Sequence, residues 1–224
     1  MGDNLQPVTI TTGEESVSGL YQPAGKAIAC LVLAHGAGAG MTHPFMAAVA
    51  EGLAERRIAT LRYQFPYMER KSKRPDSPPV AHATVRAAAA AASSLARGLP
   101  LFAGGKSFGG RMTSQAQAAS PIEGVRGLVF FGFPLHPARE PSDSRAEHLA
   151  KVKVPMLFLQ GTRDELAELT LLKPVAARLG DRATLKLLEH ADHSFHVPVK
   201  SGRRDPEVLA EGLDAVGGWI GALG

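Results

Sequence analysis

Short apolar runs alternate along this chain with longer amphipathic stretches, and this alternation limits the possible folds more than any other feature. The run Ile28–Ala34 is apolar throughout, which is typical of a strand covered on both faces. In the next stretch, from about Pro44 to Arg56, Phe45, Val49 and Leu53 recur every four residues and predict a helix with one buried stripe. Repeated β-α units of this kind predict an α/β fold with a mostly parallel sheet and helices on both faces.

The same alternation continues toward the C-terminus. After an antiparallel opening pair, it predicts strands at 58–63, 101–103, 127–132, 154–160 and 184–188. Helices are predicted from Pro78 to just before Gly98, after Ser107, at 169–179 and from Asp205, with Asp205 as N-cap. The opening pair is Val8–Thr12 with Ser16–Tyr21, and residues 64–77 are expected to form a long polar loop. No linker-like stretch divides the 224 residues, so we expect one domain over residues 1–224.

Composition and the N-terminal segment argue against several classes of protein. The chain is 45% hydrophobic and 21% charged, as expected of a globular protein. It shows no signal-peptide pattern and no apolar run near the ~18 residues of a membrane span, and its single Cys30 cannot form an internal disulfide. No zinc-finger spacing or aromatic RNA-binding motif is present. We therefore expect a cytoplasmic protein with neither membrane nor nucleic-acid partners; the residues do not indicate an oligomeric state.

The segment Gly105-Lys106-Ser107-Phe108-Gly109 fits Gly-x-Ser-x-Gly, the nucleophile elbow. In this motif the chain leaves a strand, turns sharply and enters a helix with the serine at the apex. Side chains two residues before and two after the serine would collide, so both positions require glycine. A Gly-Lys-Ser string also suggests a phosphate-binding loop, but that motif requires glycine where Pro100 stands.

A glycine-rich turn, His35–Gly40, follows the first long apolar run. In an α/β-hydrolase this turn supplies one backbone N–H of the oxyanion hole, and the residue after the nucleophile supplies the other. Ala37 and Phe108 are therefore the candidate donors, whereas His35 is expected to be a hydrogen-bonded turn residue. A merely structural turn is the alternative. The glycine spacing does not fit a dinucleotide-binding loop.

Two later loops carry a candidate acid and a candidate base. Asp164 follows a predicted strand, where a carboxylate can orient an imidazole and stabilise its charged form; Glu165 is its nearest rival. His190, His193 and His196 follow the last predicted strand, and spacing alone does not decide among them. A metal site is an alternative for three histidines at this spacing, but no Cys or Glu pattern accompanies them.

The serine, the acid and the histidine occur in the chain order that is typical of the α/β-hydrolase fold. Each of them follows a predicted strand. Because functional groups of such sheets gather in the loops at the carboxyl ends of the strands, we expect the three side chains to meet at one edge of the sheet.

Given these residues, the chain resembles the α/β-hydrolase superfamily over nearly its whole length. Within it the chain is similar to the dienelactone-hydrolase-like group, and most narrowly to the Tex30/KANL3-type hydrolase-like domain. The resemblance of 191–195 to the superfamily's histidine loop singles out His193, and that of 160–164 likewise singles out Asp164. No metal or organic cofactor is implied. The strings that carry the likeness are 35–39 (HGAGA), 65–68 (FPYM), 104–111 (GGKSFGGR), 133–137 (FPLHP), 160–164 (QGTRD) and 191–195 (ADHSF).

The residues and the resemblance together imply a serine hydrolase that cleaves a small or solvent-accessible carboxylic ester or thioester through an acyl-enzyme intermediate. Lid domains of this fold commonly follow the strand predicted at 127–132, but only Phe133–Lys153 separates it from the next strand. We therefore expect no large cap and an open site. Tyr67 and Gly38 are expected to contact the small-molecule acyl substrate, and the nearby basic run Arg70–Arg74 suggests the hypothesis of an acidic one.

Other functions are compatible with the same residues. Dienelactone hydrolases use a cysteine nucleophile, so Ser107 argues against dienelactones as substrates. A non-catalytic binding or scaffold protein that retains the fold would leave Ser107 unreactive and expose an apolar patch, for which residues 131–135 are the candidate. A peptidase, an acyltransferase or a perhydrolase could use the same three side chains.

Overall fold

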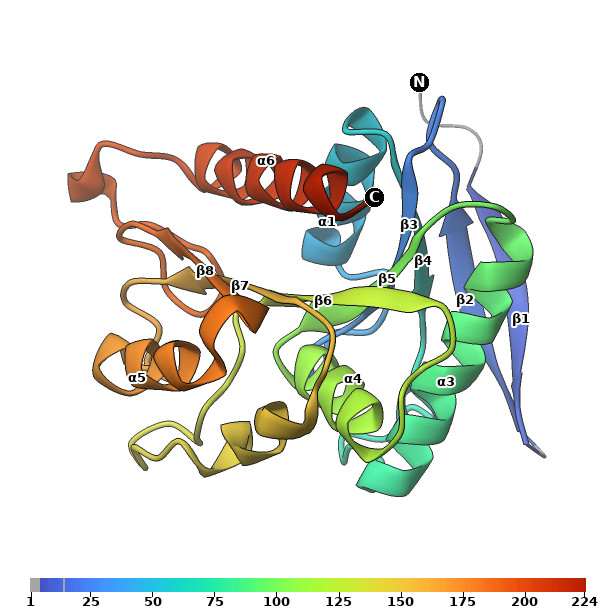
Figure 1. The fold of residues 1–224 in the computed structure, drawn as a ribbon, viewed down its shortest axis with the longest axis horizontal. Coiled ribbons are helices and arrows are strands. Elements are labelled where there is room, and N and C mark those ends of the chain that lie inside the picture. Colours follow the sequence, from blue (N-terminus) through green and yellow to red (C-terminus); the bar gives the residue numbers. More distant parts are fainter. Residues whose placement is uncertain (1–4, 14) are drawn as a thin grey trace.

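The computed structural model describes residues 5–13 and 15–224, and its centre is an eight-stranded sheet (Figure 1). The strand order is β1-β2-β4-β3-β5-β6-β7-β8. Strands β1 and β2 pair antiparallel, as do β2 and β4, and every pair from β4 to β8 is parallel. The strands are β1 (Gln6–Thr12), β2 (Glu15–Gln22), β3 (Ala29–Ala34), β4 (Ile58–Tyr63), β5 (Leu101–Lys106), β6 (Val125–Phe131), β7 (Met156–Gly161) and β8 (Ala183–Leu188).

Helices cover both faces of the sheet, which is why its central strands are apolar throughout. Every residue of β3, β4 and β7 is buried. Helices α1 (Pro44–Glu55) and α6 (Asp205–Leu223) lie on one face. Helices α3 (Pro78–Leu95), α4 (Phe108–Ala119) and α5 (Leu169–Leu179) lie on the other, with the 3₁₀ segment η1 (Ser144–Lys151) (Figure 1). The predicted α/β class and its two-sided helix layers are confirmed.

Element boundaries match the sequence-based expectation closely, with two informative differences. Strand β5 extends to Lys106 rather than ending at Ala103, because Gly104 and Gly105 continue the ladder against neighbouring strands. Helix α6 takes Arg204 as its N-cap, so the expectation of Asp205 as N-cap was wrong. The Asp205 carboxylate instead accepts hydrogen bonds from the Val197 amide and from the His196 ring.

Two short elements lie where the sequence predicted only loops. Helix α2 (Pro66–Glu69) begins the segment after β4, and η1 lies between β6 and β7. Both are too short to show the periodicity of a longer helix. The segment between β6 and β7 holds no larger element than η1, so the expectation of no large cap is confirmed. No helix in the described part of the chain is long and apolar enough to cross a membrane.

Candidate active site

The three candidate residues come from three separate strands and meet at one edge of the sheet. Ser107 directly follows β5, Asp164 lies three residues after β7, and His193 lies in the loop after β8. These strands are parallel, so their carboxyl ends lie at the same edge. The chain therefore delivers a hydroxyl, a carboxylate and an imidazole to one place, as the sequence predicted.

A continuous chain of hydrogen bonds joins the three side chains. The Ser107 hydroxyl lies 2.8 Å from His193 Nε2, and His193 Nδ1 lies 2.7 Å from Asp164 Oδ2. A carboxylate accepts only, so Nδ1 carries the proton and Nε2 presents its lone pair to the serine. This is the geometry in which an imidazole can take a proton from a hydroxyl.

The turn at Ser107 has the strained backbone expected of a nucleophile elbow. Ser107 has φ 49° and ψ −114°, outside the regions that non-glycine residues favour. A Cβ on Gly105 would lie 2.3 Å from the Ala34 carbonyl oxygen, and one on Gly109 would lie 2.5 Å from that of His35. Both glycines are thus required by the close approach of the turn to the end of β3.

Two further hydrogen bonds, besides the one from His193, hold the Asp164 carboxylate. Only 3% of Asp164 is exposed. Its Oδ1 accepts a hydrogen bond from the Leu166 amide (2.8 Å), and its Oδ2 accepts one from the Gln160 side chain. The Gln160 carbonyl oxygen in turn accepts from the Phe133 amide (2.9 Å). Glu165, the rival acid, is exposed.

Gln160 is a supporting residue that sequence reasoning missed. It is the second-to-last residue of a buried, otherwise apolar strand, where a side chain with both a donor and an acceptor is uncommon. That polar interruption, four residues before Asp164, was the available signal.

Lys106 is the second residue that sequence reasoning missed. Its Nζ donates a hydrogen bond to the His193 carbonyl oxygen. The ammonium lies 5.7 Å from the centroid of the Phe45 ring and 5.1 Å from that of the Phe195 ring. Burial lowers the pKa of Lys106 to about 8, although the charges of Asp164 and Asp192 act in the opposite direction. Lys106 thus links the elbow directly to the histidine loop.

Glycine makes room for this lysine. Gly132 follows β6 with φ 73°, and a Cβ there would lie 2.8 Å from Lys106 Nζ and 3.4 Å from His193 Nδ1. A side chain at position 132 would therefore displace the Lys106 ammonium and would be strained at this positive φ. Lys106 has no ion-pair partner among the described residues.

The glycine-rich turn lies beside the serine. A Cβ on Gly36 would lie 3.9 Å from Ser107 Cβ, and both Ala37 and Gly38 are exposed. No acceptor for the Ala37 amide is found among the described residues. Phe108 is the first residue of α4, so its amide has no acceptor within the helix. The two predicted donors therefore have N–H groups that are free to bind an oxygen.

The buried side chains of His35 and Tyr67 form hydrogen bonds with the backbone of this turn. The His35 ring donates from Nδ1 to the Gly36 carbonyl oxygen (2.7 Å) and accepts at Nε2 from the Phe65 amide (3.1 Å). Burial lowers the pKa of His35, which favours this neutral ring. The Tyr67 hydroxyl accepts from the Gly38 amide (3.0 Å), and only 1% of Tyr67 is exposed. We therefore correct the expected substrate contact of Tyr67 to a supporting role, because it has almost no surface to offer a ligand.

The other two histidines of the loop form no hydrogen bond with Ser107 or Asp164 among the described residues. His196 pairs with Asp205 at 2.9 Å, and His190 supplies its amide to the Thr162 hydroxyl. Within residues 5–13 and 15–224, no group of three or more His, Cys, Asp or Glu side chains is arranged to hold a metal ion.

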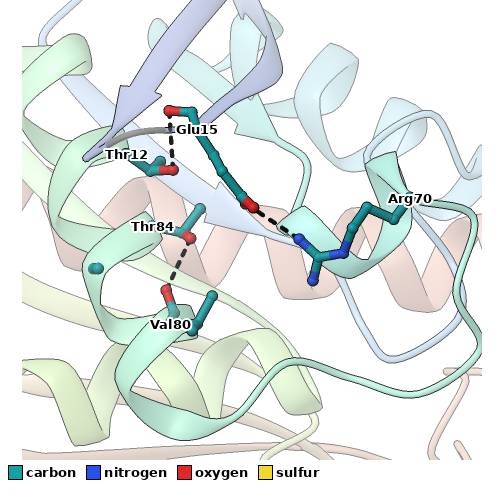
Figure 2. Close-up of a pocket in the computed structure, with 6 residues that line it drawn as sticks. Thr12, Glu15, Arg70, Val80 and Thr84 are labelled. Atoms are coloured by element: carbon teal, nitrogen blue, oxygen red, sulfur yellow. Dashed lines mark hydrogen bonds and ion pairs between the residues drawn. The ribbon is translucent and has the colours of Figure 1, made fainter.

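The basic run after α2 is partly neutralised. Arg70 pairs with Glu15 at 3.1 Å and with Asp76 at 2.7 Å. Figure 2 shows the first of these pairs, across a surface hollow between the β1–β2 hairpin and α3. Arg70, the first residue of the run, is thus paired with carboxylates next to the hairpin and is not available to bind an acidic substrate.

Solved structures share this architecture over nearly the whole chain. A dienelactone hydrolase from Anabaena variabilis superposes with a TM-score of 0.81 at 21% identity, covering 98% of both chains. A serine hydrolase without a lid from Xanthomonas campestris gives 0.73 at 19% identity, covering 96% of both. The esterase domain of a Rhodothermus marinus protein gives 0.73 at 13% identity, covering 96% of this chain and 97% of that one. At such identities the likeness shows the fold.

An eight-stranded, mostly parallel sheet without a lid, with a serine at the sharp turn after β5, defines the α/β-hydrolase class. The family described as the alpha/beta hydrolase domain matches residues 27–221. The chain therefore belongs to that family.

Proposed function

We propose that this protein is a serine hydrolase that cleaves a small or solvent-accessible carboxylic ester or thioester. One observation carries the proposal: the hydrogen-bonded series Ser107–His193–Asp164 at the carboxyl edge of the sheet. A serine, an imidazole and a buried carboxylate in this order form the constellation that activates a hydroxyl as a nucleophile.

The first half of the proposed reaction transfers the acyl group to the enzyme. Ser107 Oγ attacks the carbonyl carbon while His193 Nε2 takes the hydroxyl proton. Asp164 stabilises the imidazolium through Nδ1–H. When the tetrahedral intermediate collapses, its bond to the leaving oxygen or sulfur breaks. His193 gives its proton to that atom, and the acyl group stays on Ser107.

Water completes the cycle through the same groups. His193 takes a proton from water as the water oxygen attacks the acyl carbon, and it returns a proton to Ser107 Oγ when the acid leaves. In both tetrahedral intermediates the Ala37 and Phe108 amides donate to the oxyanion. Removing one such donor typically raises the activation free energy by ~3–4 kcal/mol.

The open surroundings of Ser107 support a small or accessible substrate. The segment between β6 and β7 forms only η1, and Ala37 and Gly38 on the opposite side are exposed. Gly38 remains a proposed substrate contact. Within the family, the strings quoted above support placing the chain in the dienelactone-hydrolase-like group, near the Tex30/KANL3-type domain.

Labelling with a fluorophosphonate probe tests the proposal, because the probe reacts with an activated serine. We expect the wild-type protein to be labelled and Ser107→Ala not to be labelled. Ser120→Ala, an exposed serine at the end of α4, is the matched control and should be labelled like the wild type.

The contrary result is absence of labelling of folded wild-type protein, which would favour the non-catalytic binding protein. The structure argues against the exposed apolar patch that the non-catalytic alternative expects. Residues 131–135, the candidate exposed apolar patch, are buried in full. They lie under the loops around Gln160 and His193.

A further inference from the structure

Two arginines beside the elbow carry charge that no carboxylate neutralises. Arg111 lies one helical turn after Ser107 in α4, and its amide donates to the Ser107 carbonyl oxygen (3.1 Å). Arg145 lies in η1, which packs against α4. Among residues 5–13 and 15–224, neither arginine forms an ion pair with Asp or Glu.

The surroundings of Arg111 are electrostatically unfavourable for a cation. Burial lowers the pKa of Arg111, and the positive charge of Arg145 lowers it further. Arg62 is a useful contrast because burial also lowers its pKa, but the negative charge of Glu51 opposes the shift. The Nε of both arginines lacks an acceptor among the described residues, but Arg62 Nη1 donates to the Met41 carbonyl oxygen, whereas no hydrogen bond from the Arg111 side chain is found there.

Nearby histidines do not relieve this excess of positive charge. His148 accepts or donates a hydrogen bond at Nε2 with the Ser114 hydroxyl (2.7 Å), and His82 lies 3.4 Å from the Gln115 carbonyl oxygen. Burial and the charge of Arg111 lower the pKa of both rings, that of His148 to about 4. They are therefore neutral near pH 7 and contribute hydrogen-bonding groups without charge.

Arg111 and His148 each lie near a residue of the candidate active site. The Arg111 guanidinium carbon lies 5.9 Å from the centroid of the Phe108 ring, and Phe108 supplies one of the proposed oxyanion donors. The His148 ring lies 6.3 Å from that of Phe133, whose amide donates to Gln160. Half-buried like charges with no counter-charge are costly, and such arrangements concentrate at functional sites.

We propose that Arg111 and Arg145 bind a carboxylate of the substrate while Ser107 attacks its ester or thioester carbonyl. This inference rests on the proposed hydrolase function and names its substrate class. A guanidinium presents a planar fork of donors that matches the two oxygens of a carboxylate. A carboxylate would also supply the missing counter-charge and an acceptor for the buried Arg111 Nε.

The spacing limits the length of such a substrate. One helical turn, a rise of about 5–6 Å, separates Arg111 from Ser107. Because Arg111 is only one turn away from the nucleophile along the helix, we take a short acyl chain that carries a terminal carboxylate as the ligand to test. The substrate class is a short monoester or monothioester of a dicarboxylic acid.

A pair of esters of equal length tests the inference. Monoethyl glutarate and ethyl pentanoate both have five acyl carbons, and only the first carries a carboxylate. With ethanol release as the readout, we expect wild-type kcat/KM to be about 10- to 100-fold higher for the acidic ester, the range of a charged hydrogen-bonded contact. Arg111→Gln and Arg145→Gln should reduce this preference at least tenfold, mainly through KM.

Two matched controls separate a specific site from general positive charge. Arg126→Gln removes an exposed arginine from β6, and Lys73→Gln removes an exposed lysine from the basic run after α2. Both should keep the wild-type preference. The far-UV circular dichroism spectrum of Arg111→Gln should match that of the wild type, which shows that the fold is intact.

Failure of the inference and failure of the proposed function give different results. A labelled wild-type enzyme that shows no preference for the acidic ester, or that cleaves neither ester, overturns the inference alone. An equal preference in Arg111→Gln overturns it as well. A folded wild-type protein that is not labelled overturns the proposed function and the inference with it.

Discussion

At the scale of single residues, Asp164 and Glu165 offer a controlled comparison. They are adjacent acids, but Asp164 is buried against His193 whereas Glu165 is exposed. Asp164→Asn replaces the acceptor with a group that favours the wrong imidazole tautomer, so we expect kcat to fall by about 10³- to 10⁴-fold. Glu165→Gln should change kcat less than twofold. Equal losses in ester hydrolysis by the two variants would contradict the assigned roles.

Lys106 is a residue whose charge the fold tolerates poorly. Its ammonium ties the histidine loop to the elbow, yet burial lowers its pKa to about 8 from the usual 10.5 of a lysine. Below about pH 8, Lys106 is charged in both the folded and the unfolded protein, and burial of this charge destabilises the folded state. Between about pH 8 and 10.5 the unfolded chain binds more protons, so this group makes stability rise with pH.

The variant Lys106→Met tests both properties of this lysine. The stability of the wild type relative to the variant, from urea unfolding, should be higher at pH 9.5 than at pH 7.5. Probe labelling of the variant should be about 10- to 100-fold slower, because the His193 loop loses its tie. Lys26→Met, at an exposed turn, should leave both measurements unchanged. A variant that labels at the wild-type rate would show that the tie does not position His193.

At the scale of elements, the crossing of the elbow over the end of β3 is the tightest contact near the site. A Cβ at Gly105 would meet the rigid Ala34 carbonyl rather than a movable side chain. We expect Gly105→Ala to destabilise the protein by about 1–3 kcal/mol or more, and to slow labelling of Ser107. In contrast, Gly218 lies in α6 with nothing within 4 Å of a Cβ, and Gly218→Ala should stabilise by about 0.5–1 kcal/mol.

Thermal or urea unfolding of both variants checks this pair of predictions. The comparison matters because both substitutions add the same methyl group, so only its surroundings differ. A Gly105→Ala protein as stable as the wild type would mean that the elbow can move away from β3.

Elements also show how far sequence reasoning reached. The apolar runs predicted β3, β4 and β7 because strands buried on both faces are largely apolar, with Thr60, Arg62 and Gln160 as the polar exceptions. The serine, acid and histidine each follow a predicted strand, and the resemblance to the superfamily singled out His193 and Asp164 among their neighbours. Helix α2 and η1 were missed because so few residues show no period. Lys106, Gln160 and Arg111 were missed as site residues because their roles depend on neighbours far away in the sequence.

At the scale of the whole molecule, the absence of a lid has a kinetic consequence. Enzymes with a closing segment over the site often change rate when that segment moves. Here the segment between β6 and β7 is short, and the turn around Ala37 is exposed. We expect the rate of hydrolysis of a short ester to rise smoothly with concentration, with no jump where the substrate forms droplets or micelles. A sharp increase at that concentration would indicate a lid-like motion that the fold does not suggest.

The likeness to solved structures also belongs to this scale. Superposition over 94–98% of the chain at 13–21% identity means that the sheet and its helix layers persist while most side chains differ. Fold and elbow could therefore be predicted from patterning, whereas substrate preference depends on individual side chains such as Arg111 and Arg145 and required their positions.

The order in which the strands occur has a consequence for the timing of reactivity during protein synthesis. Ser107 and His193 are 86 residues apart, and β8 must pair beside β7 before the histidine loop reaches the serine. A ribosome that has translated the chain only as far as α5 has already made the elbow but has not yet made its base. On the proposed mechanism, the nascent serine is chemically inert until β8 and the His193 loop have emerged.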